Sequence, residues 1–271
     1  MINSLFIPGN KEQIKAICKN GFNSFILPVE NMSIGFDSYF TLEEISVLSK
    51  EHDIYLMINK FFHHAEISEV IETLNGLKNI KGMFIEDLGL ITNLKNQNVI
   101  LYQNHLNMSY DSINMYNSLG LKNIVLSNEL TIDEIREINE KSDSKFYYFI
   151  LSKNILMYTR RNLISNYNKH FGLNSNINRS KISESVSGYE MIVKEKEYGT
   201  AVLDRKVFSG YSYYEELSNI MDYLIYNFTD LNEEEVNIVL NNIENKNLND
   251  MLDVNDYFLH NKIGYKVKDV A

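Results

Sequence analysis

The sequence predicts an α/β fold: a (β/α)8 TIM-barrel-like domain with a β-ribbon excursion after the seventh strand. Short apolar runs rich in β-branched and aromatic residues alternate with longer segments of helical spacing, the pattern of βα units on a parallel sheet. Seven such runs precede residue 155. No Pro- or Gly-rich linker divides the chain, so we expect a single domain over residues 1–271.

The expected strands are apolar runs at residues 4–9, 22–30, 53–61, 80–87, 98–105, 121–129 and 145–153. In the segments between them apolar side chains such as Ile132, Ile135 and Ile138 recur every three to four residues, which predicts amphipathic crossover helices. Gly21 and Gly120 follow two of these helices and are expected to end them.

The pattern changes after residue 155, where the chain becomes polar, basic and rich in turn-forming residues. Residues 188–209 then predict a β-ribbon that turns near Tyr198 and Gly199, so we expect an inserted loop and ribbon at about 155–210. A helix over 213–221, an apolar strand at 221–228 and a helix capped by Asp230 complete the eighth unit. The tail from Val254 is a candidate for a further edge strand.

The composition limits the classes of partner and cofactor. With 26 basic and 36 acidic residues the net charge is −10, which favours solubility and disfavours extended contact with phosphate backbones or anionic lipid. The sequence contains neither an export signal nor a membrane span, so we expect a cytoplasmic protein without membrane contact. Cys18 is the one cysteine, and we expect it to be buried on the first helix; it leaves no ligand set for a thiolate-held zinc or iron–sulfur site.

Polar residues follow the expected strands, and the carboxyl ends of parallel strands meet at one crevice. We take Asp87, His105 and Glu129 as candidate catalytic residues and Asn59 and Gln103 as candidate substrate-binding residues. Adjacent strand residues point to opposite faces, so we expect one of Glu86 and Asp87 to enter the crevice and the other to cap the next helix.

Two familiar kinds of catalytic site are not indicated. The spacing of His63, His64 and His105 matches no metal signature, so no metal site is expected. The chain has no GxSxG elbow, so a serine–histidine–acid triad is rejected.

The most basic neighbourhood contains Tyr158, Arg160 and Arg161, with Lys153 and Lys169 nearby. Arginine forks bind phosphate or carboxylate, and tyrosine can stack on a base, so Tyr158, Arg160 and Arg161 are candidate substrate-binding residues for an anion. A loop that is simply solvated by its charges is the alternative.

Several of these segments resemble the peptidase U32 family. They are the opening strand and helix at 7–27, the strand ends INK at 58–60 and EDLG at 86–89, SNELTIDEI at 127–135, and LMYTRRNLISNY at 156–167. The resemblance covers roughly residues 4–240 in order. Ser152, Asn154 and Asn162 stand in the region where that family carries cysteines, so the chain resembles a short variant without them, and no cofactor is expected.

The resemblance implies a barrel and a peptidase label, with a site at the barrel mouth for a peptide or anionic substrate. For some relatives it implies hydroxylation of RNA bases or small aromatic precursors. This chain could therefore be a cluster-less component of tRNA uridine hydroxylation that binds a tRNA-like anion, or a noncatalytic partner in a hetero-oligomer with a fuller family member. Its acidity argues against extensive RNA contact, and the missing hydrolase motif argues against protease chemistry.

Overall fold

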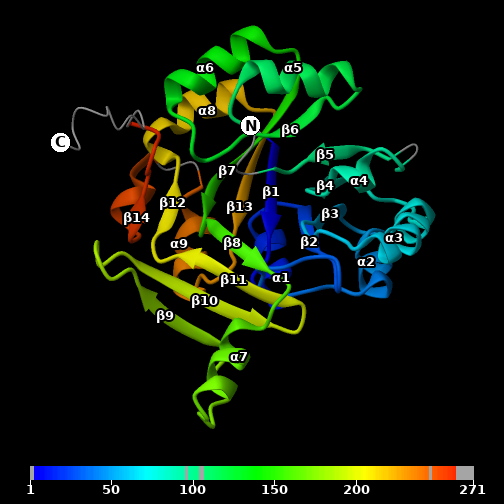
Figure 1. Cartoon of the computed structure of the whole chain (residues 1–271). Coiled ribbons are helices and arrows are strands. Elements are labelled where there is room, and N and C mark those ends of the chain that lie inside the picture. Colours follow the sequence, from blue (N-terminus) through cyan, green and yellow to red (C-terminus); the bar gives the residue numbers. More distant parts are fainter. Residues whose placement is uncertain (1–2, 95–96, 104–106, 244–245, 261–271) are drawn as a thin grey trace, which may run out of the picture.

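Eight parallel strands close into a barrel in the computed structural model, which describes residues 3–94, 97–103, 107–243 and 246–260 (Figure 1). Each strand pairs with the next along the chain, and the last closes the ring between the first and the seventh. The predicted TIM-barrel-like fold is therefore confirmed. The barrel strands are β1 Asn3–Ile7, β2 Ser24–Pro28, β3 Asp53–Ile58, β4 Gly82–Ile85, β5 Val99–Leu101, β6 Asn123–Val125, β7 Lys145–Ser152 and β13 Tyr223–Asn227.

Helices connect the barrel strands and are fixed at their ends by local sequence. Capping boxes begin α2 at Thr41, α6 at Thr131 and α9 at Asn232. Gly21 and Gly120 follow α1 and α5 with φ of 87°, a left-handed conformation that ends a helix, as predicted. The connecting helices are α1 Glu12–Lys19, α2 Leu42–Leu48, α3 His64–Gly76, α4 Leu88–Ile91, α5 Tyr110–Ser118, α6 Ile132–Lys141 and α8 Tyr214–Ile220. Helix α9 Glu233–Asn241 follows the last barrel strand, and short 3-10 turns lie at Tyr211–Tyr213 and Lys246–Asp250.

The alternation of side chains along the strands divides the core into two clusters. One fills the space between the barrel and its helices, and the other fills the barrel interior. In the interior the rings of Tyr147 and Tyr223 stack with their centroids 4.6 Å apart. The barrel is thus a packed core, and a ligand can reach it only at its mouth.

A second, four-stranded antiparallel sheet follows β7, where the excursion was predicted (Figure 1). Its strands are β8 Ile155–Thr159, β9 Arg179–Ser183, β10 Glu190–Lys196 and β11 Gly199–Asp204, and α7 Leu163–His170 lies between β8 and β9. The predicted ribbon is β10 and β11, which pair from Lys196 opposite Gly199. Gly199 has φ of 143° and lies so close to Thr159 that a Cβ would be 2.3 Å from the Thr159 carbonyl oxygen, so only glycine fits there.

Two short strands extend the barrel sheet outside the ring. β12 Val207–Ser209 pairs antiparallel with the end of β7, and β14 Val254–Asn255 pairs with β12. The tail therefore supplies the edge strand for which it was a candidate. That residues 1–271 form one domain stays a prediction.

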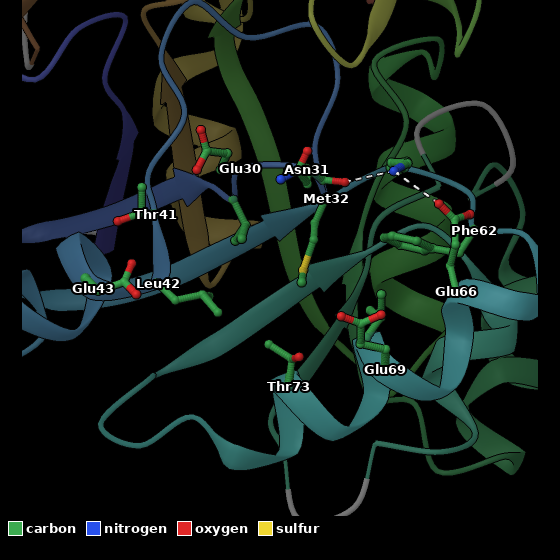
Figure 2. Close-up of a pocket in the computed structure, with 13 residues that line it drawn as sticks. Glu30, Asn31, Met32, Thr41, Leu42, Glu43, Phe62, Glu66, Glu69 and Thr73 are labelled. Carbon is green, nitrogen blue, oxygen red and sulfur yellow. Dashed lines mark hydrogen bonds and ion pairs between the residues drawn. The ribbon is translucent and has the colours of Figure 1, made fainter.

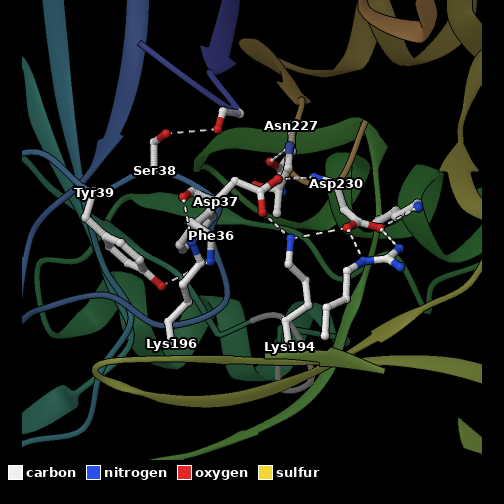
Figure 3. A network of polar contacts seen from close by, with 12 residues as sticks. Phe36, Asp37, Ser38, Tyr39, Lys194, Lys196, Asn227 and Asp230 are labelled. Atoms are coloured by element: carbon white, nitrogen blue, oxygen red, sulfur yellow. Dashed lines mark hydrogen bonds and ion pairs between the residues drawn. The ribbon is translucent and has the colours of Figure 1, made fainter. Parts of the chain in front are cut away.

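Charged side chains fasten the four-stranded sheet to the barrel mouth (Figure 3). Asp230, which follows β13, accepts from Lys153 Nζ at 2.7 Å, from Lys194 Nζ at 3.2 Å and from Arg179 Nη2 at 3.1 Å. Lys194 also pairs with Asp37, whose Oδ2 accepts from the Asp230 backbone N–H at 2.5 Å. These contacts join β9 and β10 to loops that follow β2, β7 and β13.

The network corrects the prediction that Asp230 caps a helix. Asn232 caps α9 instead, because its Oδ1 accepts from the Glu235 N–H at 2.9 Å. Asp230 has φ of 61° and is 8% exposed at its side chain. Burial alone would raise the pKa of Asp230, but hydrogen bonds from Arg179 and Lys153 hold it well below its usual range.

Candidate site at the barrel mouth

Polar residues form the last inward-facing layer of the barrel. Met57, Phe84, Val125 and Ile225 belong to the interior cluster. Two residues further along their strands the inward direction repeats, and the residues at those positions are Asn59, Glu86, Ser127 and Asn227. The mouth of the barrel is therefore lined with groups that can hydrogen-bond.

A cavity of about 300 Å³ opens beside this layer, between the ends of β3, β4 and β5 and strand β8. We call it the mouth cavity. Phe61 and Tyr158 stand together at it with nearly parallel rings, 6.2 Å between centroids. Its walls are mostly aromatic and aliphatic, and its lining residues are Asn59, Phe61, Glu86, Tyr102, Ile155, Leu156, Met157 and Tyr158.

Glu86 is the ionisable carboxyl group of the mouth cavity. Burial raises the pKa of Glu86 to about 8, with the Tyr158 hydroxyl opposing the rise and the charge of Asp87 adding to it. The carboxyl group is therefore largely protonated at neutral pH, and it can donate one hydrogen bond and accept others. Burial raises the pKa of Tyr158 as well, so its hydroxyl also stays protonated.

The Tyr158 hydroxyl is buried, and it makes no hydrogen bond of normal geometry to the part of the chain that the structure describes. Leaving a buried hydroxyl unpartnered costs about 1–3 kcal/mol. A ligand that entered the mouth cavity and reached this hydroxyl would remove that cost, so Glu86 and Tyr158 are the candidate polar contacts of the cavity.

Asn59, a candidate substrate-binding residue from the sequence, lines the mouth cavity, but its side-chain amide is already hydrogen-bonded within the protein. Its Oδ1 accepts from the Ile34 N–H at 2.9 Å, and its Nδ2 donates to the Ile34 carbonyl at 3.0 Å. Asn59 is almost fully buried. The contact orders the β2–α2 loop, so the structure supports a positioning role for Asn59.

The two adjacent carboxylates divide their roles as expected, one entering the crevice and the other capping a helix. Asp87 is the cap of α4: its Oδ1 accepts from the Gly89 N–H at 2.8 Å, and its Oδ2 accepts from the Phe62 N–H at 3.1 Å. Glu86 is the one that lines the mouth cavity. The catalytic role predicted for Asp87 stays untested, and the geometry favours Glu86 for contact with a ligand.

The remaining candidates from the strand ends lie elsewhere. Gln103 is buried between the barrel and α5, where its Nε2 donates to the Glu86 carbonyl at 3.2 Å and its Oε1 accepts from the Tyr116 hydroxyl at 3.1 Å. Glu129 is half-buried in the β6–α6 loop and is not a lining residue of the mouth cavity. His105 lies outside the described residues. Their predicted roles stay predictions.

The two arginines that were predicted to bind an anion differ in their contacts. Arg160 forms a two-pronged ion pair with Glu66 of α3, with both N–O distances 2.9 Å. These hydrogen bonds, together with one from the His63 N–H, lower the pKa of Glu66 to about 2. Arg161 is exposed, and the described residues offer it no ion pair. Arg160 is thus already engaged, whereas Arg161 is available to an anion.

A second cavity, of about 420 Å³, lies between α2 and α3 and is shown in Figure 2. Glu30, Glu43 and Glu69 stand around it, and Lys60 is its cation. Lys60 Nζ donates to the Asn31 carbonyl at 2.9 Å and lies 3.7 Å from Glu66. Because Lys60 is satisfied internally, this cavity offers a ligand less than the mouth cavity does.

The residues do not fit a cysteine-held iron–sulfur cluster. The lone cysteine, Cys18, is on α1 and packs against the core outside the barrel. In the region where the family carries cysteines, Ser152 Oγ and Asn128 Nδ2 both donate to Asn154 Oδ1, at 2.8 and 3.1 Å. Across the described ranges, three or more His, Cys, Asp or Glu side chains nowhere gather closely enough to hold a metal ion.

The model of Peptidase family U32 matches residues 9–229, most of the chain. The chain belongs to peptidase family U32. The match spans the barrel from the end of β1 to the end of β13, and it includes the mouth cavity and the four-stranded sheet. It confirms the resemblance that the strand-end segments indicated.

This U32 chain is also similar to two curated proteins. "tRNA hydroxylation protein P" of Haemophilus influenzae is 28% identical over 145 residues, which are 51% of this chain and 30% of that protein. "tRNA hydroxylation protein P1" of Bacillus subtilis is 25% identical over 171 residues, which are 59% of this chain and 40% of that protein. The matched region is thus less than half of each relative's length.

Among solved structures, the spore cortex-lytic enzyme SleL of Bacillus megaterium is similar with a TM-score of 0.38 and 8% identity, over 83% of this chain and 70% of that one. A likeness this weak supports no argument about function. In the described part of the U32 chain, every helix is too short or too polar to cross a membrane.

Proposed function

We propose that this U32 protein takes part in tRNA hydroxylation and that its mouth cavity receives the edge of a uracil base. The observation that carries the proposal is the buried Glu86 carboxyl group, whose pKa burial raises, beside the buried Tyr158 hydroxyl in the wall of the mouth cavity. A neutral carboxyl presents a donor next to an acceptor, and the N3–H and O4 of uracil present the complementary pair. The names of the two relatives support the same function.

The walls of the mouth cavity suit a base as well. Proteins that act on a base hold it between aromatic or apolar side chains and read its edge with hydrogen bonds. Phe61, Tyr102 and Tyr158 provide aromatic walls, and Ile155 and Met157 provide apolar ones. A planar, uncharged group with a polar edge therefore matches this site better than a small anion, which would meet no cation among the lining residues.

The experiment compares the tRNA nucleosides of a strain that lacks this gene with those of strains carrying variants. We expect hydroxylated uridine to disappear in the deletion strain and to return with the parent gene. Glu86→Gln should restore it, because the amide keeps a neutral donor and acceptor, whereas Glu86→Ala should not. Unchanged nucleosides in the deletion strain would refute the proposed function.

Peptide cleavage is the second candidate, because a carboxyl group with a pKa of about 8 can act as a general acid at neutral pH. The purified protein is therefore tested against peptides in parallel. Cleavage that is lost in both Glu86→Gln and Glu86→Ala would favour a peptidase over RNA modification. A hetero-oligomer with another U32 protein, the roles of His105 and Glu129, and a cytoplasmic location stay predictions.

A further inference from the structure

Residues 160–183, which we call the basic arm, differ in charge from the rest of the chain. The basic arm contains five lysines and arginines and not one aspartate or glutamate. The whole chain has a net charge of −10, so the remainder carries −15. A phosphate backbone is therefore repelled by most of the surface and attracted to this segment.

Helix α7 of the basic arm projects from the second sheet, and the last residues of the arm are strand β9 of that sheet (Figure 1). None of the residues of α7 is buried. Tyr167 and Phe171 are 58% and 59% exposed, and their ring centroids lie 4.6 Å apart. Unpaired nucleic-acid bases stack on exposed aromatic rings of this kind.

The first turn of α7 is hydrogen-bonded to the second sheet. The buried Glu195 carboxylate of β10 accepts from the Ile164 N–H at 2.7 Å and from the Ser165 N–H at 3.1 Å. The positive end of α7 is thereby neutralised within the protein. An anion that approaches the arm must be bound by its side chains, not by the helix N-terminus.

Three cations of the basic arm are available for binding. Arg160 is paired with Glu66, and Arg179 is paired with Asp230. Arg161, Lys169 and Lys181 are exposed and form no ion pair with the residues that the structure describes. Arg161 lies three residues after Tyr158 of the mouth cavity, so the arm continues directly from the wall of that cavity.

We infer that the basic arm is the surface on which this protein holds the backbone and unpaired bases of an RNA whose target base enters the mouth cavity. The inference rests on the proposed function and assigns to it a binding surface. The positive charge of the basic arm attracts phosphate, and its exposed aromatic rings can stack on bases. An anionic membrane fits less well, because six asparagines are interspersed among the apolar residues of the arm and a flat membrane surface would leave the neighbouring mouth cavity unused.

The test measures the affinity of labelled tRNA for the purified full chain at two or more salt concentrations. One variant is Lys169→Gln with Lys181→Gln, and the other is Tyr167→Ala with Phe171→Ala. The matched control is Lys78→Gln with Lys145→Gln, which removes two exposed lysines at the opposite, amino-terminal end of the barrel strands. Thermal midpoints should stay near that of the parent, because none of the substituted side chains is buried.

We expect the lysine variant to bind tRNA roughly tenfold more weakly and to lower the salt dependence of log K by about 1 to 2 units, whereas the control binds like the parent. The aromatic variant should lose about 5- to 100-fold. Parent-like affinity in both arm variants would overturn the inference while leaving the nucleoside result, and with it the proposed function, intact. A parent protein that binds no RNA, or an arm that binds only anionic vesicles, would overturn it too.

Discussion

At the scale of single residues, the proton on Glu86 sets both what the mouth cavity binds and how stability depends on pH. The pKa of Glu86 is about 8 in the folded protein, against 4.5 for an ordinary glutamate. Between these values the unfolded chain has lost a proton that the folded protein keeps. The free energy of unfolding should therefore fall as the pH rises through this window, by up to about 1.4 kcal/mol per pH unit.

Glu86→Gln should remove that decline. The free energy of unfolding of the variant should therefore rise relative to that of the parent between about pH 5 and pH 8, and the difference between the two should stay constant above pH 8. Urea unfolding at three or four pH values measures it. Glu69→Gln is the control, because Glu69 is an exposed carboxylate of α3. A stability difference between Glu86→Gln and the parent that does not change with pH would show that Glu86 is ionised in the folded state.

The same residue shows how far the sequence predicts the site. Glu86 and Asp87 were both identified at the end of their strand, and alternation required that only one face the barrel mouth. Counting in steps of two from the buried Phe84 selects Glu86, a signal present in the sequence once the inward phase is known. The side-chain amide of Asn59 is hydrogen-bonded to the backbone of Ile34, which is 25 residues away in the sequence, and no local pattern predicts such a contact.

The two arginines of the predicted anion site should respond differently to substitution. Arg160→Gln should lower stability by up to about 1 kcal/mol and have little effect on tRNA binding, because Arg160 is paired with Glu66. Arg161→Gln should leave the thermal midpoint unchanged and weaken tRNA binding, more so at low salt. Equal effects of the two substitutions on tRNA affinity would contradict the structural difference between them.

At the scale of elements, the second sheet depends on the charges that fasten it to the barrel. Asp230→Asn would leave Lys194 paired with Asp37 and would remove the carboxylate that pairs with Lys153 and Arg179. Breaking a buried ion pair by removing one partner typically costs about 3–5 kcal/mol. Hydrogen exchange should accelerate most in β9 and β10, because Arg179 and Lys194 lie on these strands.

Glu190→Gln is the matched control, since it removes a carboxylate of the same sheet from an exposed pair with Arg205. It should cost less than about 1 kcal/mol. If Asp230→Asn cost no more than Glu190→Gln, or if the barrel strands and the second sheet exchanged equally fast, the network would not be what holds the sheet in place.

The elements themselves were predictable where hydrophobic pattern alone determines them. The barrel strands follow from apolar runs, and the ribbon β10–β11 follows from its turn at Gly199. Strand β8 was not predicted, because Ile155–Thr159 leads into a basic segment and its partner is β11, some forty residues later. The role of Asp230 was predicted wrongly for a related reason. The local sequence resembles a helix cap, but the side chains that donate to its carboxylate are distant in the sequence: Lys153 after β7, Arg179 on β9 and Lys194 on β10.

At the scale of the whole molecule, the chain separates an acidic body from a basic arm. The net charge of −10 correctly describes the average surface, but an average hides a local patch. The sequence argument against extensive RNA contact therefore applies to the body alone, where the remaining charge is −15. This separation favours one orientation of an approaching polyanion, with the arm toward it.

The thiol content of the whole chain leads to the last prediction: protein purified without oxygen will contain no stoichiometric iron or acid-labile sulfide. Iron–sulfur clusters are held by several cysteine thiolates, and this chain has Cys18 alone. Burial raises the pKa of Cys18, which disfavours the thiolate form that binds metal. Cys18→Ala should therefore leave tRNA nucleosides unchanged. Stoichiometric iron and sulfide in the isolated protein would show that clusters are held here by other ligands, and would reopen redox chemistry within this chain.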